Sequence, residues 1–220
     1  MRAQILQLPN RGRQANRASL YDLRFRALVD SSAWDRLPDQ VKRRFTKRLS
    51  GPAVALYRGL VVQMHVSPVG WLLAQMCRLF GAPLPLCRDT GVAALVSVSE
   101  DASSGGQCWT RVYARPHRFP QVIHSAKRFA GPTGLEEYLG RGLGMALSIE
   151  TLDDGIAFVS DHYFVQIARL RIRLPVWMTP GTTRVVHRQI AGSSFLFELE
   201  LTHPRAGRLF HQQVLFEDVD

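Results

Sequence analysis

The chain has 220 residues, of which 46% are hydrophobic, and it carries a formal net charge of +10. This length and composition suit a single folded domain and exclude disorder as the default state. The three cysteines, Cys77, Cys87 and Cys108, lie at long spacings, which predicts buried free thiols rather than a disulfide framework or a C-x-x-C zinc site. No apolar run near the N-terminus suits a signal peptide, so we expect a cytoplasmic protein, with a position peripheral to the inner membrane as the alternative.

The positive charge is concentrated in the first quarter of the chain. Residues 1–60 hold 13 Lys and Arg against four Asp and Glu, whereas residues 61–220 hold 15 against 14. Residues 1–18 contain four arginines and no acidic residue, which predicts a basic mobile arm ahead of a single domain at 19–220. A basic face of this kind attracts the phosphates of anionic lipid headgroups or of nucleic acid.

Two helices are expected before residue 50. Ser19 is expected to begin the first, because Asp22 follows three residues later, as in a capping box. Pro38 suits the first turn of the second helix, where its missing N–H costs nothing. The basic residues of this second segment form a candidate surface for anionic headgroups, and they are Lys42, Arg43, Arg44, Lys47 and Arg48.

The most apolar stretch, VGWLLAQMCRLFGAP at 69–83, follows a predicted strand at 53–66. Its helical part is well under the ~20 residues that a bilayer span requires. A wide apolar stripe along it predicts a helix that packs on the concave side of a sheet. One alternative is a lid over an apolar cavity, with Trp71, Met76 and Phe80 pointing inward. Another is a helix that lies on a membrane surface.

The chain from Gly91 onward alternates between short strand patterns and turn residues. Leu143, Met145, Leu147 and Ile149 share one face of the clearest hairpin, whose turn is marked by Asp154-Gly155. SFLFELELTHP likewise places phenylalanines and leucines opposite two glutamates. We therefore predict an α+β fold that is mostly antiparallel β. It is a strongly curved sheet or partly open barrel of eight to nine strands, with two to three helices and the helix at 69–80 on the concave side.

Four strings carry a resemblance to a known family: FRALVDSSAWDRLPDQVKRRF, GWLLAQMCRLFGAPLP, CWTRVY and SSFLFELELTHPRAGRLF. Over most of residues 22–217 the chain resembles a bacterial family named for a domain of unknown function, DUF4166. Members of that family are often fused to a saccharopine-dehydrogenase-like NAD(P) domain. The resemblance implies an accessory role beside an oxidoreductase. The chain itself has no Gly-x-Gly-x-x-Gly motif after a first strand, so no cofactor is predicted.

Three polar patterns are candidate sites with competing explanations. Trp109, Arg111 and Tyr113 share one strand face, which suits a ligand pocket, a nucleic-acid groove or a plain amphipathic surface. The pair Asp161-His162 lies mid-strand, either facing solvent or anchoring a pocket. A third pattern is the arginine row, which either grips phosphates or forms cross-strand ion pairs with two glutamates at the same period. The row is Arg169, Arg171 and Arg173, and the glutamates are Glu198 and Glu200.

No motif predicts a catalytic residue or a metal site, because the seven histidines lie at scattered spacings and no nucleophilic serine motif is present. We therefore favour a domain that binds an apolar or amphiphilic, lipid-like small molecule in its curved sheet, with an anionic membrane surface as a candidate location. The candidate ligand-binding residues are Trp71, Met76, Phe80, Trp109, Arg111, Tyr113, Asp161 and His162. The alternatives are an accessory partner of an oxidoreductase, a less favoured nucleic-acid binder acting through the basic N-terminus, and an enzyme using Asp161, His162 and Arg111.

Overall fold

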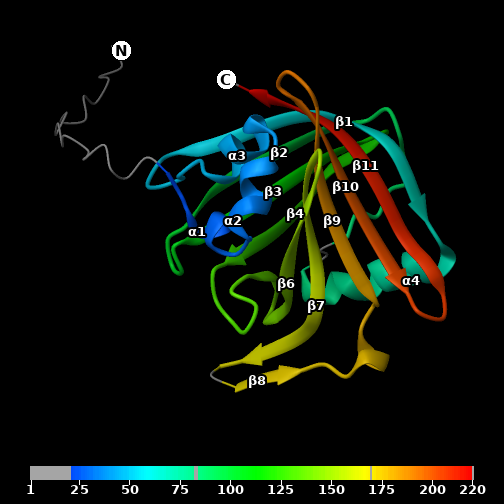
Figure 1. Cartoon of the computed structure of the whole chain (residues 1–220). Helices are drawn as coiled ribbons and strands as arrows, with labels where there is room; N and C mark the ends of the chain where they lie inside the picture. The colour runs from blue at the N-terminus through cyan, green and yellow to red at the C-terminus, as the bar shows by residue number, and fades with distance from the viewer. Residues whose placement is uncertain (1–20, 82–83, 169, 220) are drawn as a thin grey trace, which may run out of the picture.

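The computed structural model describes residues 21–81, 84–168 and 170–219. Within these ranges eleven strands form one antiparallel sheet in the order β6-β5-β4-β3-β2-β1-β11-β10-β9-β7-β8 (Figure 1). The strands are β1 (Val54–Val66), β2 (Ala93–Asp101), β3 (Gly106–Arg115), β4 (Arg118–Arg128), β5 (Glu136–Gly140), β6 (Leu143–Leu152), β7 (Gly155–Ile167), β8 (Leu170–Arg173), β9 (Thr182–Ala191), β10 (Ser194–His203) and β11 (Gly207–Val219). The helices are α1 (Arg24–Ala27), α2 (Ser31–Arg36), α3 (Asp39–Phe45) and α4 (Pro68–Cys77), with the short 3-10 helices η2 (Arg78–Phe80) and η3 (Val176–Met178).

The sheet is closed into a barrel by a further pairing between β6 and β7, which joins its two ends. Ten strands form the barrel, and β8 extends it as an extra strand on β7. The predicted, mostly antiparallel fold is thus confirmed. The sequence left two alternatives, an open curved sheet and a barrel, and the structure shows a closed barrel. Closure pairs the strand edges that would otherwise be open to other chains.

Strand alternation fills the interior as predicted. Phe195, Phe197 and Leu201 of β10 are buried in the core, whereas Glu198 and Glu200 point outward between them. Burying one such apolar side chain contributes about 1.5–3 kcal/mol, so a register slip of one residue would be strongly disfavoured.

The β6–β7 hairpin turns at Asp153 and Asp154, as the Asp-Gly dipeptide predicted. Gly155 begins β7 directly against the backbone carbonyl of His187 on β9, where a Cβ atom would overlap that oxygen. A glycine is required here by this close approach of two backbones.

Residues 21–49, here called the N-terminal plug, close one end of the barrel (Figure 1). Phe25, Trp34, Val41 and Phe45 of the plug are buried in the same core cluster as the barrel side chains. The first helix is shorter than expected, because Asp30 caps a separate helix by accepting hydrogen bonds from the N–H groups that follow it. The predicted arm at 1–18 and the start of the first helix at Ser19 lie outside the described residues.

Arg44 joins the plug to the barrel. Its Nη2 lies 3.0 Å from Asp218 Oδ2 of β11, and its Nη1 donates to Gln189 Oε1 at 2.7 Å. The guanidinium also lies 4.3 Å from the ring centroid of Phe195, and only 6% of the side chain is exposed. The expectation that Arg44 belongs to a solvent-facing basic surface is therefore wrong, because α3 turns this residue toward the barrel wall.

Helix α4 packs against the other end of the barrel, beside the start of β11 (Figure 1). Ser67 caps it by accepting a hydrogen bond from the Gly70 N–H at 3.0 Å, and Pro68 occupies its first turn. Gly70 fits directly against the Leu209 carbonyl of β11. Within the described part of the chain, no helix combines the length and the apolar character needed to cross a membrane.

We predict that Arg44→Met lowers the free energy of unfolding by about 2–3 kcal/mol, because it leaves the partly buried Asp218 and Gln189 without their hydrogen bonds from the guanidinium. Arg43→Met is the matched control, since Arg43 is exposed on the same helix, and its effect is expected within about 0.5 kcal/mol. Urea denaturation followed by circular dichroism measures both. Equal stability of the two variants would contradict the locking role of Arg44.

Candidate functional site

The barrel encloses a cavity of about 380 Å³, here called the large cavity, at the α4 end. Most of its wall is apolar and comes from the inward faces of the strands, from α4 and from the connection between β8 and β9. The lining residues that the argument uses are Met76, Arg111, Met145, Val165, Met178 and Phe197. The volume falls within the range of about 300–1,000 Å³ that is typical of small-molecule sites.

The large cavity is reached where the barrel wall divides. β7 pairs with β9 only from Gly155 to Val159, and its later residues, Phe164 to Ile167, pair with β8 instead. The connection from β8 to β9 and helix α4 both line the cavity at this level. Met76 and Met178 line the cavity from α4 and η3 and are more than half exposed. Other exposed apolar side chains on α4, η2 and η3 are Trp71, Leu72, Leu79, Val176 and Trp177.

A group of charged side chains, here called the interior charge cluster, lies inside the barrel. It consists of Arg111 on β3, Lys127 on β4 and Glu137 on β5. Lys127 Nζ lies 2.6 Å from Glu137 Oε2, with 3% and 4% of the two side chains exposed. Arg111 Nη2 lies 3.5 Å from Glu137 Oε1, and Arg111 Nη1 donates to Ser125 Oγ at 3.0 Å. The cluster therefore opposes two cationic side chains to one carboxylate.

The ionisation of the interior charge cluster follows from this arrangement. Burial alone would raise the pKa of Glu137, but Lys127 and Arg111 outweigh it and lower that pKa to about 2. Burial lowers the pKa of Lys127, and the nearby charge of Arg111 acts in the same direction, while Glu137 opposes both. Glu137 is thus firmly anionic, and the excess positive charge of the cluster is the unfavourable part of its energetics.

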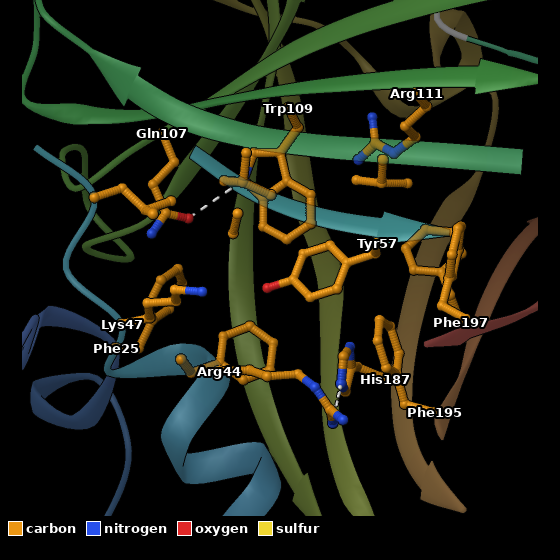
Figure 2. A pocket seen from close by; sticks show the side chains of 16 residues that line it. Phe25, Arg44, Lys47, Tyr57, Gln107, Trp109, Arg111, His187, Phe195 and Phe197 are labelled. Carbon is orange, nitrogen blue, oxygen red and sulfur yellow. Dashed lines mark hydrogen bonds between the residues drawn. The ribbon is translucent and has the colours of Figure 1, made fainter. Parts of the chain in front are cut away.

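A second, small cavity of about 40 Å³ lies between the N-terminal plug and the interior charge cluster (Figure 2). Arg44 and His187 point into it from one side, and Trp109 and Arg111 from the other. His187 Nε2 lies 3.3 Å from Arg44 Nη1, and its ring stacks on Phe195 at a centroid distance of 4.2 Å. Burial and the adjacent Arg44 charge lower the pKa of His187 to about 3, so this imidazole is neutral at physiological pH.

The structure brings several predicted ligand-binding residues together. Trp109, Arg111 and Tyr113 all point into the barrel from β3, with Arg111 lining both cavities. Burial raises the pKa of Tyr113 to about 12, so its phenol stays protonated. Met76 lines the large cavity from α4, as the lid interpretation of this helix expected. Met76, Arg111 and Tyr113 therefore line the large cavity, whereas Trp109 lines the small one.

Other predicted ligand-binding residues lie elsewhere. Trp71 is 46% exposed and does not line the large cavity. Asp161 and His162 hydrogen-bond to each other at 2.6 Å, and Asp161 is exposed at a bulge where β7 slips against β6. The side chain of Phe80 lies outside what the structure describes. Asp161 therefore matches the solvent-facing alternative, whereas the His162 side chain is only 10% exposed, and neither residue lines the large cavity.

The remaining basic surface is at the opposite end from the opening. On the N-terminal plug, Lys42 is partly exposed, and three further basic residues are exposed: Arg43, Lys47 and Arg48. The plug lies next to the end of β11, whereas α4 packs beside its start. A headgroup bound by this surface would lie a barrel length away from the opening of the large cavity. The structure thus separates two features that the sequence had suggested might act together.

The predicted pairing of the arginine row with two glutamates is wrong. β8 pairs with β7, and β10 is not its neighbour in the sheet. Arg171 instead forms an ion pair with the buried Glu136 of β5 and lies over the Phe164 ring at 3.6 Å. Arg173 is exposed, and Arg169 lies outside the described residues.

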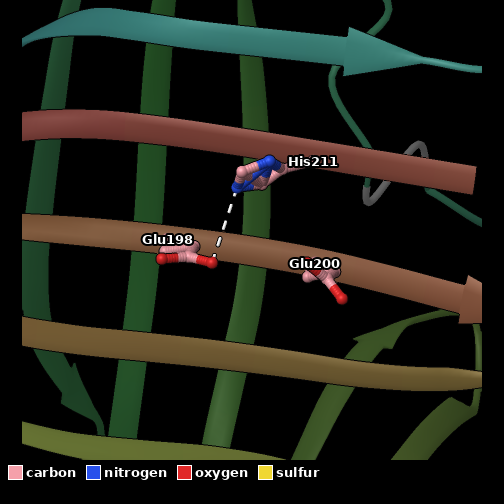
Figure 3. A group of neighbouring side chains, drawn as sticks. All are labelled: Glu198, Glu200 and His211. Atoms are coloured by element: carbon pink, nitrogen blue, oxygen red, sulfur yellow. Dashed lines mark ion pairs between the residues drawn. The ribbon is translucent and has the colours of Figure 1, made fainter. Parts of the chain in front are cut away.

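Glu198, Glu200 and His211 form a group on the outer wall that the sequence spacing did not reveal (Figure 3). One donor atom from each lies within 4.8 Å of the others, and His211 Nε2 is 3.5 Å from Glu198 Oε1. Two carboxylates and an imidazole are a donor set that can hold a divalent transition metal. The group is assembled by the register that places Glu200 opposite His211, which a search for short metal motifs along the chain does not detect.

The fold and cavities together define a closed antiparallel β-barrel with a hollow, largely apolar interior. The sequence profile of a family described as "Domain of unknown function (DUF4166)" matches residues 37–216, from the end of α2 into β11, and the chain belongs to this family. A search of curated proteins and a search of solved structures each gave no match. Association with an NAD(P)-dependent domain, nucleic-acid binding and catalysis stay predictions.

Two of the three members of the interior charge cluster were not among the predicted site residues. Lys127 and Glu137 lie at inward positions of β4 and β5, where their strand neighbours Ile123, Ser125 and Leu139 also face the interior. A charged residue in a strand pattern is normally assigned to the solvent side. The available signal was their alternation in step with Ile123 and Leu139, which becomes visible only when strand register is known.

The pKa of His187 gives a pH prediction. This pKa is about 3 in the folded protein, whereas the ordinary value for histidine is 6.5. Folding therefore favours the neutral imidazole. Between these two pH values only the unfolded chain gains a proton at this residue. The free energy of unfolding should therefore fall as the pH drops below about 6.5, with a contribution of about 1.4 kcal/mol per pH unit from this residue.

We expect His187→Gln to remove this contribution, so that its stability falls less steeply than that of the unmodified protein between pH 6 and pH 5. Urea denaturation at a series of pH values measures the slope. His124→Gln is the control, because His124 is exposed on β4, and it should keep the steeper slope. Identical slopes for the unmodified protein and His187→Gln would refute the assignment.

Proposed function

We propose that this barrel binds an apolar or amphiphilic small molecule in its large cavity. The single observation that carries the proposal is a space of about 380 Å³ walled mainly by leucine, methionine, valine and aromatic side chains. Protein interiors are otherwise close-packed, with few voids larger than a water molecule. A space of this size and composition at the centre of a fold favours an apolar guest over water, because water finds few hydrogen-bond partners there.

The composition of the wall supports a flexible fit. Met76, Met145 and Met178 line the large cavity from three different elements. Methionine side chains are unbranched and polarisable, so they adapt to guests of different shape. This favours a lipid-like guest with a variable apolar body over a small polar metabolite, which would need several converging hydrogen-bonding groups.

The surroundings of the opening support a route for such a guest. Trp177 is 80% exposed on η3, and Leu72 and Leu79 are exposed on α4 and η2. Exposed apolar side chains that gather around a cavity mouth are typical of binding surfaces. An amphiphile could thus pass from an apolar surface into the barrel without its chain crossing a polar barrier.

Native mass spectrometry of protein purified without detergent tests the proposal directly. We expect a co-purified small molecule that is lost on extraction with organic solvent. The extracted protein should then bind the uncharged fluorophore N-phenyl-1-naphthylamine with a rise in fluorescence. Protein that carries no such molecule and fails to bind the fluorophore would overturn the proposal.

The variant Val165→Trp tests whether the fluorophore binds inside the large cavity. The indole would project into the large cavity, and we expect affinity for the fluorophore to fall about 10-fold or more, since part of the apolar contact area is lost. Val122→Trp is the matched control, because Val122 is 45% exposed on the outer face of β4. Unchanged binding by a folded Val165→Trp variant would place the fluorophore outside the large cavity.

A further inference from the structure

The interior charge cluster contains more positive than negative charge inside an apolar barrel. Lys127 and Arg111 face one carboxylate, Glu137, and the three side chains are 3%, 12% and 4% exposed. A buried charge without a partner is costly, so a cluster of this kind gains stability from one additional anion. The excess positive charge therefore indicates that a further group bound at this cluster would be negatively charged.

Arg111 and Glu137 both line the large cavity, and Arg111 is the cationic one of the two. Lys127 is held by Glu137 and lies between the rings of Trp109 and Phe158, 5.1 and 5.2 Å from their centroids. Arg111 instead lines both cavities, with its guanidinium at the boundary between them. It is thus the cation that the large cavity presents to its contents.

The guanidinium of Arg111 retains hydrogen-bonding capacity. Among the described residues, its hydrogen bonds are one to Ser125 Oγ at 3.0 Å and a long one to Glu137 at 3.5 Å. A guanidinium carries five N–H donors in a planar fork, so donors remain for a further acceptor. A carboxylate matches that fork with two parallel hydrogen bonds and supplies the single negative charge that the cluster lacks.

We propose that the large cavity selects amphiphiles with a carboxylate headgroup, which Arg111 binds while the apolar tail extends toward α4 and η3. The inference rests on the proposed function, because it specifies the ligand class of the same cavity. The Tyr163 hydroxyl, which hydrogen-bonds to Thr183 at 2.6 Å, lies along the wall between the headgroup position and the opening. The rest of the tail would contact Met145, Met76 and Met178.

Three ligands of equal chain length test the headgroup preference on the unmodified protein: dodecanoic acid, dodecanol and dodecylamine. Displacement of N-phenyl-1-naphthylamine at neutral pH gives their relative affinities. We expect the acid to bind about 10- to 100-fold more tightly than the alcohol, as for a hydrogen bond to a charged group in a buried site, and the amine to bind most weakly. Equal affinities for acid and alcohol, or tighter binding of the amine, would overturn the inference.

Arg111→Gln supplies the matching variant. We expect it to lose the preference for the acid, so that dodecanoic acid and dodecanol bind with affinities within about 3-fold of each other. The fold should persist, because the Lys127–Glu137 pair remains and the interior loses its excess charge; thermal unfolding checks this. Arg118→Gln, an exposed position on β4, is the control and should keep the full preference. A preference that survives Arg111→Gln would overturn the inference.

The variant Arg111→Lys distinguishes the loss of a specific contact with the carboxylate from a general structural effect of replacing Arg111. It keeps the charge but removes the planar fork, so we expect an intermediate preference for the acid. The outcomes also separate this inference from the proposed function. Binding of the fluorophore and of dodecanol without any acid preference would leave the cavity as an apolar site and refute the headgroup assignment alone. Failure of all ligands to bind would refute both.

Discussion

The pairing of β6 with β7 is the constraint on which the rest of the structure depends. It fixes the number of strands around the barrel at ten. Side chains fill the interior of a barrel of about eight strands, and the diameter grows with each added strand. A ten-stranded barrel is therefore wider than its own inward side chains can fill. The extra width is filled at one end of the barrel and left largely empty at the other, and the empty space is the candidate site.

The two ends differ in what occupies the extra width. At one end the N-terminal plug inserts Phe25, Val41 and Phe45 into the barrel, and Arg44 fixes it to β9 and β11 through partly buried hydrogen bonds. Only a space of about 40 Å³ is left there. At the other end α4 lies across the rim, and the wall opens where β7 leaves β9, so a space of about 380 Å³ remains.

The sequence predicted the parts of this architecture that depend on local pattern. Alternation placed the inward faces of β6 and β10 correctly, Asp154-Gly155 marked its turn, and the inward row on β3 contained Arg111. Closure was not predictable, because periodicity defines the faces of a strand and says nothing about which distant strands pair. The same limit hid Lys127 and Glu137, which meet only because β4 and β5 are neighbours in register. The exposure of Arg44 was predicted wrongly for a related reason. The pattern of a basic helix does not indicate which of its cationic side chains forms an ion pair with an acidic residue on a distant strand.

The position of the interior charge cluster between the two differently filled ends has a physical consequence. The plugged end excludes water on one side of Arg111, and apolar walls do so on the other. Electrostatic interactions are stronger in such surroundings than at a surface, so a single excess charge there has a large effect on what the barrel accepts. The basic residues of the plug surface, although more numerous, are solvated and screened by salt, and they lie at the end opposite the opening. The net charge of the chain therefore describes its surface, whereas we propose that the selectivity of the cavity depends on one buried guanidinium and its neighbours.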